Sequence, residues 1–427
     1  MKIISAADYR EELLNPKAVE ERNEKLDESV LSIIAEVRKN GDKALFSYTE
    51  QFDKVKLQSL LVSEAEFAEA RGLVSKEFLT AMEQAKENIT SFHSEQKERS
   101  WFVNKENGVL LGQKVTPLER VGIYVPGGKA AYPSTVLMDA LPAKIAGVPS
   151  ITMTTPPQQN GKVNPHVLVA AELAGVDKVY KIGGAQAIAA LAYGTETIEK
   201  VYKIVGPGNA FVARAKKWVY GDVAIDMIAG PSEICVVADD TCNTSYAAAD
   251  LLSQAEHDEQ ASAICVVMNE QIGQEIQAET LKQLKQLERS EIAGKSIADN
   301  GRIVIASDFE EAYEIVNLLA PEHLQLMVAN PMEAMNRVHN AGAIFLGNYS
   351  PEPLGDYFAG PNHTLPTNGT AAFASPLGVY DFIKKSSIIS YSRDALLQAA
   401  DSIATIANME GLTAHAKSIT IRKDDTK

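Results

Sequence analysis

The sequence has few cysteines, no long apolar run and a deficit of positive charge. The chain has three cysteines, Cys235, Cys242 and Cys265. This number is too small, and odd, for a disulfide framework or a thiolate zinc site. No run approaches the roughly 18 uncharged apolar residues that cross a bilayer, and charge interrupts the N-terminal segment before a signal core could form. These absences predict a cytoplasmic protein without a membrane span.

Acidic residues outnumber basic ones by 56 to 41, and the formal net charge is −15. Such a surface repels phosphate backbones and anionic lipid, so we expect neither nucleic acid nor a membrane as a partner. Hydrophobic residues make up 45% and charged residues 23% of the 427 positions, which is ordinary for a folded globular chain. At about 150 residues per domain, the length predicts roughly two to four domains.

The pattern along the chain predicts an α/β fold class. Residues 1–110 are mostly helical in period, whereas from Val121 onward short apolar runs rich in β-branched residues alternate with helical stretches. Strands that are apolar throughout, separated by helices, are typical of parallel sheets covered on both faces. Two such series occur, at 121–205 and 233–347, and the pattern alone leaves open whether one interrupts the other or the two lie in series.

Glycine-rich turns follow two of the strands, at GGAQAIAALAYG and GPGNAFVARA. Each opens a helix whose free N–H groups could hold a phosphate. Neither matches GxGxxG, and no acidic residue follows a second strand at the distance that a dinucleotide site requires. Walker A, GxSxG, HExxH and CxxC sequences are absent as well. We therefore expect two Rossmann-like parallel-sheet domains that lack the usual dinucleotide fingerprint.

Two segments place histidine beside other reactive side chains. Gln254 and His257 lie three apart on a predicted helix and can converge on a metal, although a solvent-facing helix end explains these two residues at least as well. Glu322 and His323 follow Pro321 at the start of an apolar strand. They could supply general bases, although a solvated loop pair is the commoner interpretation.

Two further segments near the C-terminus carry the same residue types. The stretch 347–371 has little apolar periodicity and holds Asp356 and His363. Long irregular segments in compact domains are usually functional or disordered, and the aromatic residues of this one argue against disorder. Glu410 and His415 fit a surface helix end as well as they fit a site.

Taken in order, five motifs resemble the L-histidinol dehydrogenase family: GPGNAFVARAKKWVYGDVAIDMIAGPSEI, LLSQAEHD, APEHLQL, GDYFAGPNHTLPT and EGLTAHAKSI. The similarity extends from about Thr116 to Arg422, and five motifs in the right order are far more specific than any one. It implies an enzyme of the last steps of histidine biosynthesis. That enzyme oxidises L-histidinol through L-histidinaldehyde to L-histidine with two NAD, as a homodimer with one Zn²⁺ per subunit.

The resemblance also implies a role for each matching residue. The zinc ligands, which also contact substrate, would be Gln254, His257, Asp356 and His415. Glu322 and His323 would be the two proton acceptors, with His323 also touching substrate. The further substrate contacts would be Ser232, His363 and Glu410, and the NAD contacts would be Tyr124, Gln186 and Asn209.

The expected domains are a helical segment 1–25, a discontinuous Rossmann-like domain 26–122 and 233–377, a second one 123–232, and a helical C-terminal domain 378–427. In the family the last of these crosses to the partner subunit, so Glu410 and His415 would complete the neighbour's site.

Three other functions compete with this interpretation. A zinc hydrolase would use the same ligands, with Glu322 activating a metal-bound water. A metal-binding protein without enzymatic activity would take up zinc and turn nothing over. A relative of the family could oxidise a different amino alcohol, although the residues at positions 363 and 410 resemble those that face histidinol.

Overall fold

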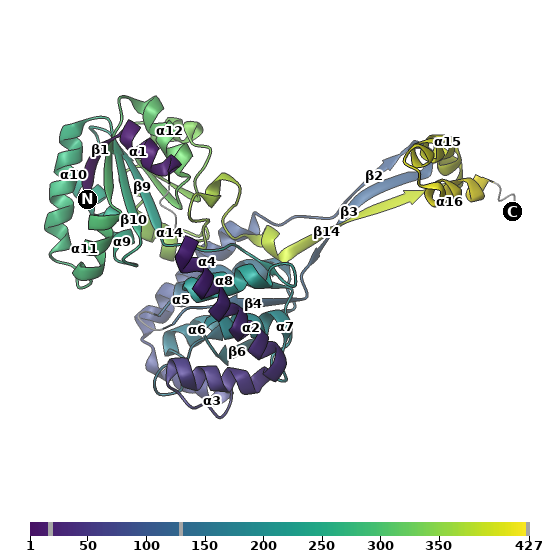
Figure 1. Ribbon diagram of the computed structural model, residues 1–427, viewed down its shortest axis with the longest axis horizontal. Coiled ribbons are helices and arrows are strands. Elements are labelled where there is room, and N and C mark those ends of the chain that lie inside the picture. The colour runs from purple at the N-terminus through teal and green to yellow at the C-terminus, as the bar shows by residue number, and fades with distance from the viewer. Residues whose placement is uncertain (16–19, 128–130, 424–427) are drawn as a thin grey trace. The chain divides into compact units, whose positions relative to one another are not determined.

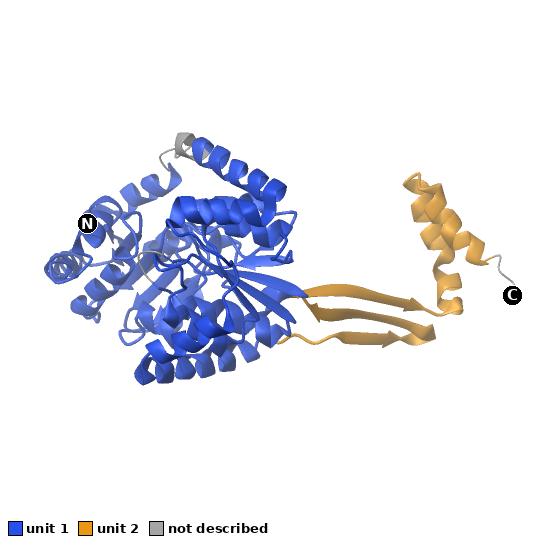
Figure 2. Ribbon diagram, turned by 90° about the horizontal axis from the view of Figure 1, so that it is seen from below, with its two compact units in different colours: residues 1–96, 118–382 blue, residues 97–117, 383–427 orange. Residues whose placement is uncertain are grey.

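The computed structural model describes residues 1–15, 20–127 and 131–423 (Figure 1). The chain divides into two compact units, 1–96 with 118–382 and 97–117 with 383–427, which Figure 2 colours separately. Among the described residues, no helix combines the length and the apolar character needed to cross a membrane.

The larger sheet of the first unit is parallel and has the strand order β1-β11-β10-β9-β12-β13. Its strands are β1 (Lys2–Ser5), β9 (Glu233–Ala238), β10 (Ser262–Val267), β11 (Arg302–Ile305), β12 (His323–Met327) and β13 (Ala343–Leu346). The chain builds β9, β10 and β11 outward and then returns to place β12 on the other side of β9. The strand order therefore reverses between β9 and β12, where α/β sheets commonly offer a crevice.

The smaller sheet repeats this topology with the order β6-β5-β4-β7-β8. Its strands are β4 (Arg120–Tyr124), β5 (Ser150–Thr155), β6 (Lys178–Lys181), β7 (Lys203–Val205) and β8 (Ala224–Ile225). Here the order reverses between β4 and β7. The expected α/β class with two Rossmann-like parallel sheets is confirmed.

Helices cover both faces of the larger sheet, which explains its uninterrupted apolar strands. On β9, Cys235 and Val237 join the core beneath α1 (Ala6–Leu14) and α12 (Phe309–Leu319). The alternate residues Val236 and Ala238 join the core beneath α9 (Thr244–Ala255), α10 (Glu270–Leu284) and α11 (Ser290–Asp299). Because successive side chains point to opposite faces, a strand between two helical layers must be apolar at every position.

The helices around the smaller sheet include the N-terminal ones. One core contains residues of α3 (Glu64–Leu73), α4 (Lys76–Ser94), α5 (Pro133–Ala146) and α6 (Pro165–Ala174). The other contains residues of α2 (Glu20–Tyr48), α7 (Gly184–Tyr193) and α8 (Ala210–Val219). Figure 1 shows α2, α3 and α4 beside this sheet.

This packing differs from the expected domain grouping in two places. The sequence pattern groups 26–96 with 233–377, but the helices of 26–96 pack on the sheet formed by 120–225, because their apolar faces complete the two cores of that sheet. The segment 1–25 was expected to be helical, yet Lys2–Ser5 forms edge strand β1 of the other sheet, paired with β11.

The second unit contains an antiparallel sheet that the sequence analysis did not anticipate. Strand β3 (Val109–Pro117) pairs with both β2 (Trp101–Lys105) and β14 (Ile383–Tyr391). The segment 378–427 is therefore not wholly helical, although α15 (Arg393–Met409) and α16 (Thr413–Lys423) follow β14 and pack through small alanines. Strand β14 is largely exposed and polar, and its partner comes from much earlier in the chain, so local periodicity gives little sign of it.

Candidate active site

The reactive side chains of the first unit gather at the amino-terminal edge of the larger sheet. Glu233 and His323 are the first residues of β9 and β12, and His323 pairs in register with Ile234 across the reversal of strand order. Helix α9 begins after the carboxyl end of β9 and runs back along the sheet, so its last turn brings Gln254, and the residues after it His257, to the strand starts. Ligands usually bind at the opposite, carboxyl edge of such sheets, so this placement is unusual.

His323 is buried, with only 4% of its surface exposed, and the backbone sets its orientation. Its Nδ1 lies 3.0 Å from the carbonyl oxygen of Glu233 and donates to it. The other ring nitrogen, Nε2, is buried without a hydrogen-bond partner. It lies 3.7 Å from Asp356 Oδ1 and 4.0 Å from Glu352 Oε1. The nitrogen able to accept a proton therefore faces the acidic side chains.

Glu322 lies on the other side of this imidazole. Its Oε2 accepts a hydrogen bond from the backbone N–H of Glu233 at 2.9 Å and lies 3.7 Å from His323 Nδ1. Burial raises the pKa of Glu322 to about 7. Burial works to lower the pKa of His323, but the charges of Glu322 and Asp356 outweigh it and raise that pKa to about 10. Glu322 is thus tuned toward proton transfer near neutral pH, whereas the carboxylates around His323 favour its protonated form.

A possible metal-binding cluster lies next to His323. His257, Glu352 and Asp356 each offer one ligand atom, and these three atoms lie within 4.8 Å of one another. Ser253 Oγ donates to Glu352 Oε2 at 3.0 Å, while Glu352 Oε1 and Gln254 Oε1 are buried without hydrogen-bond partners. Buried oxygens without donors and a nearby imidazole form an N/O donor set that suits a divalent cation.

The pKa values of this cluster show how strongly its carboxylates interact. Burial, followed by the charge of Asp356, raises the pKa of Glu352 to about 8. The pKa of Asp356 is lowered: burial opposes the shift, but the nearby imidazole of His323 and the charge of His363 prevail. Burial also lowers the pKa of His257, which keeps its imidazole neutral and able to bind a metal.

Glu352 was not anticipated by the sequence analysis. It lies on the short helix α14 (Glu352–Tyr357), one turn before Asp356, and is almost fully buried. The sequence did contain one sign of its role: Glu352 lies four residues before Asp356, a predicted ligand, and residues with this spacing share a helix face.

The remaining predicted residues of this region occupy different places. His363 donates through Nδ1 to the backbone oxygen of Asp356 at 2.9 Å, and its Nε2 lies 3.2 Å from Thr135 Oγ1, so it links the α14 loop to α5. Ser232 is half-buried directly before β9. Glu410 and His415 belong to the second unit, where both are exposed, Glu410 at the end of α15 and His415 on α16.

The three residues expected to contact a dinucleotide lie at the carboxyl edge of the smaller sheet. Tyr124 ends β4, and its hydroxyl accepts a hydrogen bond from the N–H of Gly184 at 3.1 Å. Gln186 follows on α7, and Asn209 caps α8 by accepting from the backbone N–H groups of its first turn. Tyr124 ends β4 and Asn209 follows β7, the strands that flank the reversal of strand order where α/β sheets bind nucleotides, while Gln186 follows the edge strand β6.

A buried ion pair shapes the turn that leads to Asn209. Lys216, with 1% of its surface exposed, pairs with Asp226 and donates to the carbonyl oxygen of Gly206 at 2.9 Å. Asp226 Oδ2 accepts from the N–H of Gly206 at 2.8 Å. Gly206 has φ +113°, and a Cβ there would lie 2.1 Å from the carbonyl oxygen of Tyr124, so only glycine fits.

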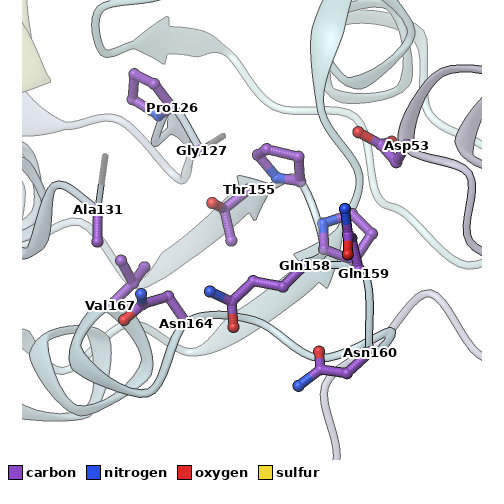
Figure 3. A pocket seen from close by; sticks show the side chains of 12 residues that line it. Asp53, Pro126, Gly127, Ala131, Thr155, Gln158, Gln159, Asn160, Asn164 and Val167 are labelled. Carbon is purple, nitrogen blue, oxygen red and sulfur yellow. The ribbon is translucent and has the colours of Figure 1, made fainter. Parts of the chain in front are cut away.

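A pocket of about 790 Å³ opens at the same carboxyl edge (Figure 3). Its walls come from the ends of β4 and β5 and from the loop before α6, and include Pro126, Gly127, Thr155 and Asn164. A volume of this size lies within the range of small-molecule sites, about 300–1,000 Å³. The first unit thus has, at one sheet, buried acid–base groups beside residues that could hold a metal and, at the other, a pocket of small-molecule size.

Comparison with known proteins gives a consistent result. The family model for histidinol dehydrogenase matches residues 17–423. The chain is 56% identical over 425 residues to histidinol dehydrogenase from Oceanobacillus iheyensis, covering 100% of this chain and 99% of that one. It is 56% identical over 417 residues to the protein of that name from Listeria monocytogenes, covering 97% of each. The crystal structure of histidinol dehydrogenase from Elizabethkingia anophelis superimposes with a TM-score of 0.93 at 40% identity, covering 99% of this chain and 98% of that one. The chain therefore belongs to the histidinol dehydrogenase family.

Proposed function

We propose that this chain catalyses the NAD-dependent, four-electron oxidation of L-histidinol to L-histidine through L-histidinaldehyde, the final steps of histidine biosynthesis. We further propose that it requires zinc and works in the cytoplasm as a homodimer. The observation that carries the proposal is the position of His323, whose unpartnered Nε2 lies 3.7 Å from Asp356 in the metal-binding cluster. An acid–base residue beside a metal ligand is what oxidation of a chelated amino alcohol needs.

The residues present fit a zinc ion. Gln254, His257 and Asp356 are the proposed ligands within one subunit, and the unpartnered Oε1 of Gln254 is an available donor. Zinc held there would fix histidinol through its imidazole and amino nitrogens. His415 and Glu410 are proposed to complete the site of a partner subunit. The exposed apolar side chains of the second unit, among them Trp101, Phe102, Val103, Ile406 and Met409, support its burial against another copy.

His323 is the proposed base for both oxidations. Because its Nδ1 is held as a donor by the Glu233 carbonyl, its Nε2 is the atom that accepts the hydroxyl proton as hydride leaves for NAD. Two of the carboxylates that raise its pKa, Asp356 and Glu352, belong to the cluster where a bound cation would neutralise them, so metal binding would favour the neutral imidazole that this step requires.

Glu322 is the proposed base for the hydration that separates the two oxidations. Its carboxylate takes a proton from the water that adds to the aldehyde, and its pKa of about 7 leaves much of it ionised at neutral pH. His323 then accepts the proton of the hydrate as the second hydride leaves. Both bases are buried, which limits the contact of the aldehyde with bulk water and free amines.

The test follows NADH formation from L-histidinol with excess NAD, before and after chelator treatment. About two NADH per histidinol, lost on chelation and restored by zinc, is the expected result. One NADH per histidinol would remove the second half-reaction and the role of Glu322 in it. Zinc-loaded, folded protein that forms no NADH would refute the dehydrogenase and favour a zinc hydrolase that uses Glu322 to activate water.

A further inference from the structure

The pocket at the carboxyl edge of the smaller sheet contains one carboxylate that comes from an unexpected part of the chain. Asp53 is the last residue of the helical turn η1 (Thr49–Asp53), directly after α2. Among the described residues that line the pocket it is the only charged one (Figure 3). The other polar side chains of the lining are neutral: Thr155, Gln158, Gln159, Asn160 and Asn164.

One oxygen of the Asp53 carboxylate lacks a donor. Its Oδ2 is buried without a hydrogen-bond partner, and burial raises the pKa of Asp53 to about 6. Asp53 as a whole is only half-buried and lines the pocket, so its carboxylate, an acceptor-only group, can receive O–H or N–H donors from a ligand. The charge of Asp53 also acts on Tyr124, where, after burial, it contributes to raising the pKa to about 12. Pro126 and Gly127, which line the pocket together with Asp53, directly follow Tyr124 and Val125 in the chain, so Asp53 lies at the same end of β4 as this proposed NAD contact.

Asp53 lies where a dinucleotide-binding fold would have an acidic residue after its second strand, a residue that β5 does not supply here. In dinucleotide-binding α/β folds, an acidic residue after the second strand accepts hydrogen bonds from the adenosine ribose. Here β5 is that second strand, next to β4 and away from the reversal, and it runs into Thr155-Pro156-Pro157 without an acid. Packing of α2 against α7 and α8 places Asp53 beside these residues instead.

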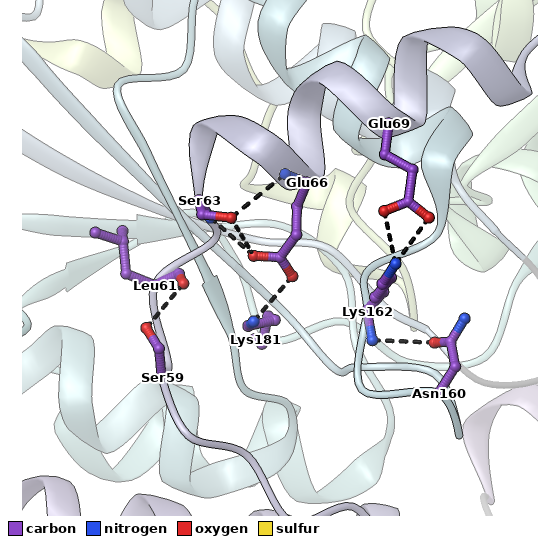
Figure 4. Close-up of polar contacts among 8 residues, drawn as sticks. All are labelled: Ser59, Leu61, Ser63, Glu66, Glu69, Asn160, Lys162 and Lys181. Carbon is purple, nitrogen blue, oxygen red and sulfur yellow. Dashed lines mark hydrogen bonds and ion pairs between the residues drawn. The ribbon is translucent and has the colours of Figure 1, made fainter.

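Polar contacts hold the neighbouring walls in place (Figure 4). Lys181 pairs with Glu66 at 2.9 Å and ties the start of α3 to the end of β6. Lys162 pairs with Glu69 at 2.6 Å, and its N–H donates to Asn160 Oδ1 at 3.0 Å, which holds the loop between β5 and α6. These contacts hold the start of α3 and the loop between β5 and α6 beside the pocket.

We propose that Asp53 accepts hydrogen bonds from the ribose hydroxyls in the adenosine half of NAD and sets the preference for NAD over NADP. This inference rests on the proposed function for its cofactor. A vicinal diol offers two O–H donors to one carboxylate. The 2′-phosphate of NADP would instead bring negative charge to Asp53, and no described lining residue carries a compensating positive charge.

The test compares Asp53→Asn with Glu50→Gln in zinc-loaded, full-length protein. Glu50 is an exposed carboxylate on the same turn, so its variant makes the same change of charge outside the pocket. NADH binding is titrated by fluorescence, and KM and kcat are measured for NAD and NADP with saturating L-histidinol. For Asp53→Asn we expect NADH affinity to fall and KM for NAD to rise by roughly tenfold, with kcat nearly unchanged and relative use of NADP increased.

Two results would overturn the inference: an unchanged NADH affinity and NAD/NADP ratio in folded Asp53→Asn, or equal losses in both variants. Circular dichroism verifies folding, and Asp53→Ser, which leaves room for a 2′-phosphate, provides a second variant with the same expected shift. The binding titration does not depend on turnover. A wild-type protein that binds NADH but does not oxidise histidinol would refute the proposed function and leave the role of Asp53 to be decided by the titration.

Discussion

Replacing Glu322 by Gln should separate the two oxidations. The Gln side-chain oxygen can still accept the hydrogen bond that Glu322 Oε2 takes from the N–H of Glu233 at 2.9 Å, so we expect the fold to persist. The amide cannot accept a proton from water. Removing a positioned general base lowers a rate by about 10²–10⁴-fold, so the second NADH should form slower by roughly that factor while the first forms at nearly the wild-type rate.

The pH dependence gives a second, quantitative expectation for Glu322. Its pKa is raised to about 7, and the base acts when it has lost its proton. The wild-type rate of aldehyde oxidation should therefore rise with pH, by about tenfold between pH 6 and pH 8, as the ionised fraction grows from about one-tenth to nine-tenths. The variant should lose this increase.

The assay is a single-turnover experiment that records NADH absorbance after mixing zinc-loaded enzyme and NAD with L-histidinol. A parallel series starts from L-histidinaldehyde, which isolates the second oxidation. If the variant oxidises the aldehyde at the wild-type rate, or keeps the wild-type pH dependence, Glu322 is not the base. If the variant loses both oxidations equally, Glu322 acts in a step common to both.

Three further changes test the metal cluster, the core and the shared site. Glu352→Gln should weaken zinc binding by roughly tenfold or more in a chelator competition, because it removes a buried negative charge from the cluster. Lys216→Met should lower the free energy of unfolding by about 3–5 kcal/mol in a denaturant titration, because it leaves Asp226 charged and buried, whereas pairing it with Asp226→Asn should recover part of the loss. A mixture of His415→Asn and His323→Asn chains should regain part of the activity that each lacks, because mixed dimers would contain one intact shared site.

Each of these experiments has its own control or contrary outcome. Asp258→Asn changes an exposed carboxylate just after His257, and a loss of zinc affinity equal to that of Glu352→Gln would show a general charge effect only. Lys217→Met alters an exposed neighbour of Lys216 and should change stability little. Mixed dimers that are no more active than either parent would count against a site shared between subunits.

The amino-edge position of the metal cluster has a simple structural cause. Helix α9 returns along the sheet to the strand starts, and the α14 segment follows β13, so residues distant in sequence meet beside His323. The carboxyl edge of the other sheet remains available for a dinucleotide. The larger sheet thus carries the metal cluster and the smaller sheet the proposed dinucleotide site. This division is consistent with a chain that is proposed to use NAD and yet lacks a GxGxxG fingerprint.

Local patterns in the sequence determined much of what the structure contains. The strands EICVVA and SAICVV are buried on both faces, and this alone predicts a parallel sheet between helical layers, as observed. The pairs Gln254/His257 and Glu322/His323 were recognisable because helical spacing and a strand start place them on short, well-defined elements. Each of these signals depends on neighbours within a few residues.

Only the tertiary structure decided features that depend on contacts between distant segments. Strand β14 pairs with β3, and the helices of 26–96 pack on the smaller sheet instead of the larger one, because apolar faces that look alike in sequence find their partners only through packing. Glu352 joins His257, and Asp53 reaches the pocket beside β5, by the same long-range packing. Periodicity determines which face of an element is apolar, but the burial of that face against a particular neighbour depends on the shape and area of the whole core.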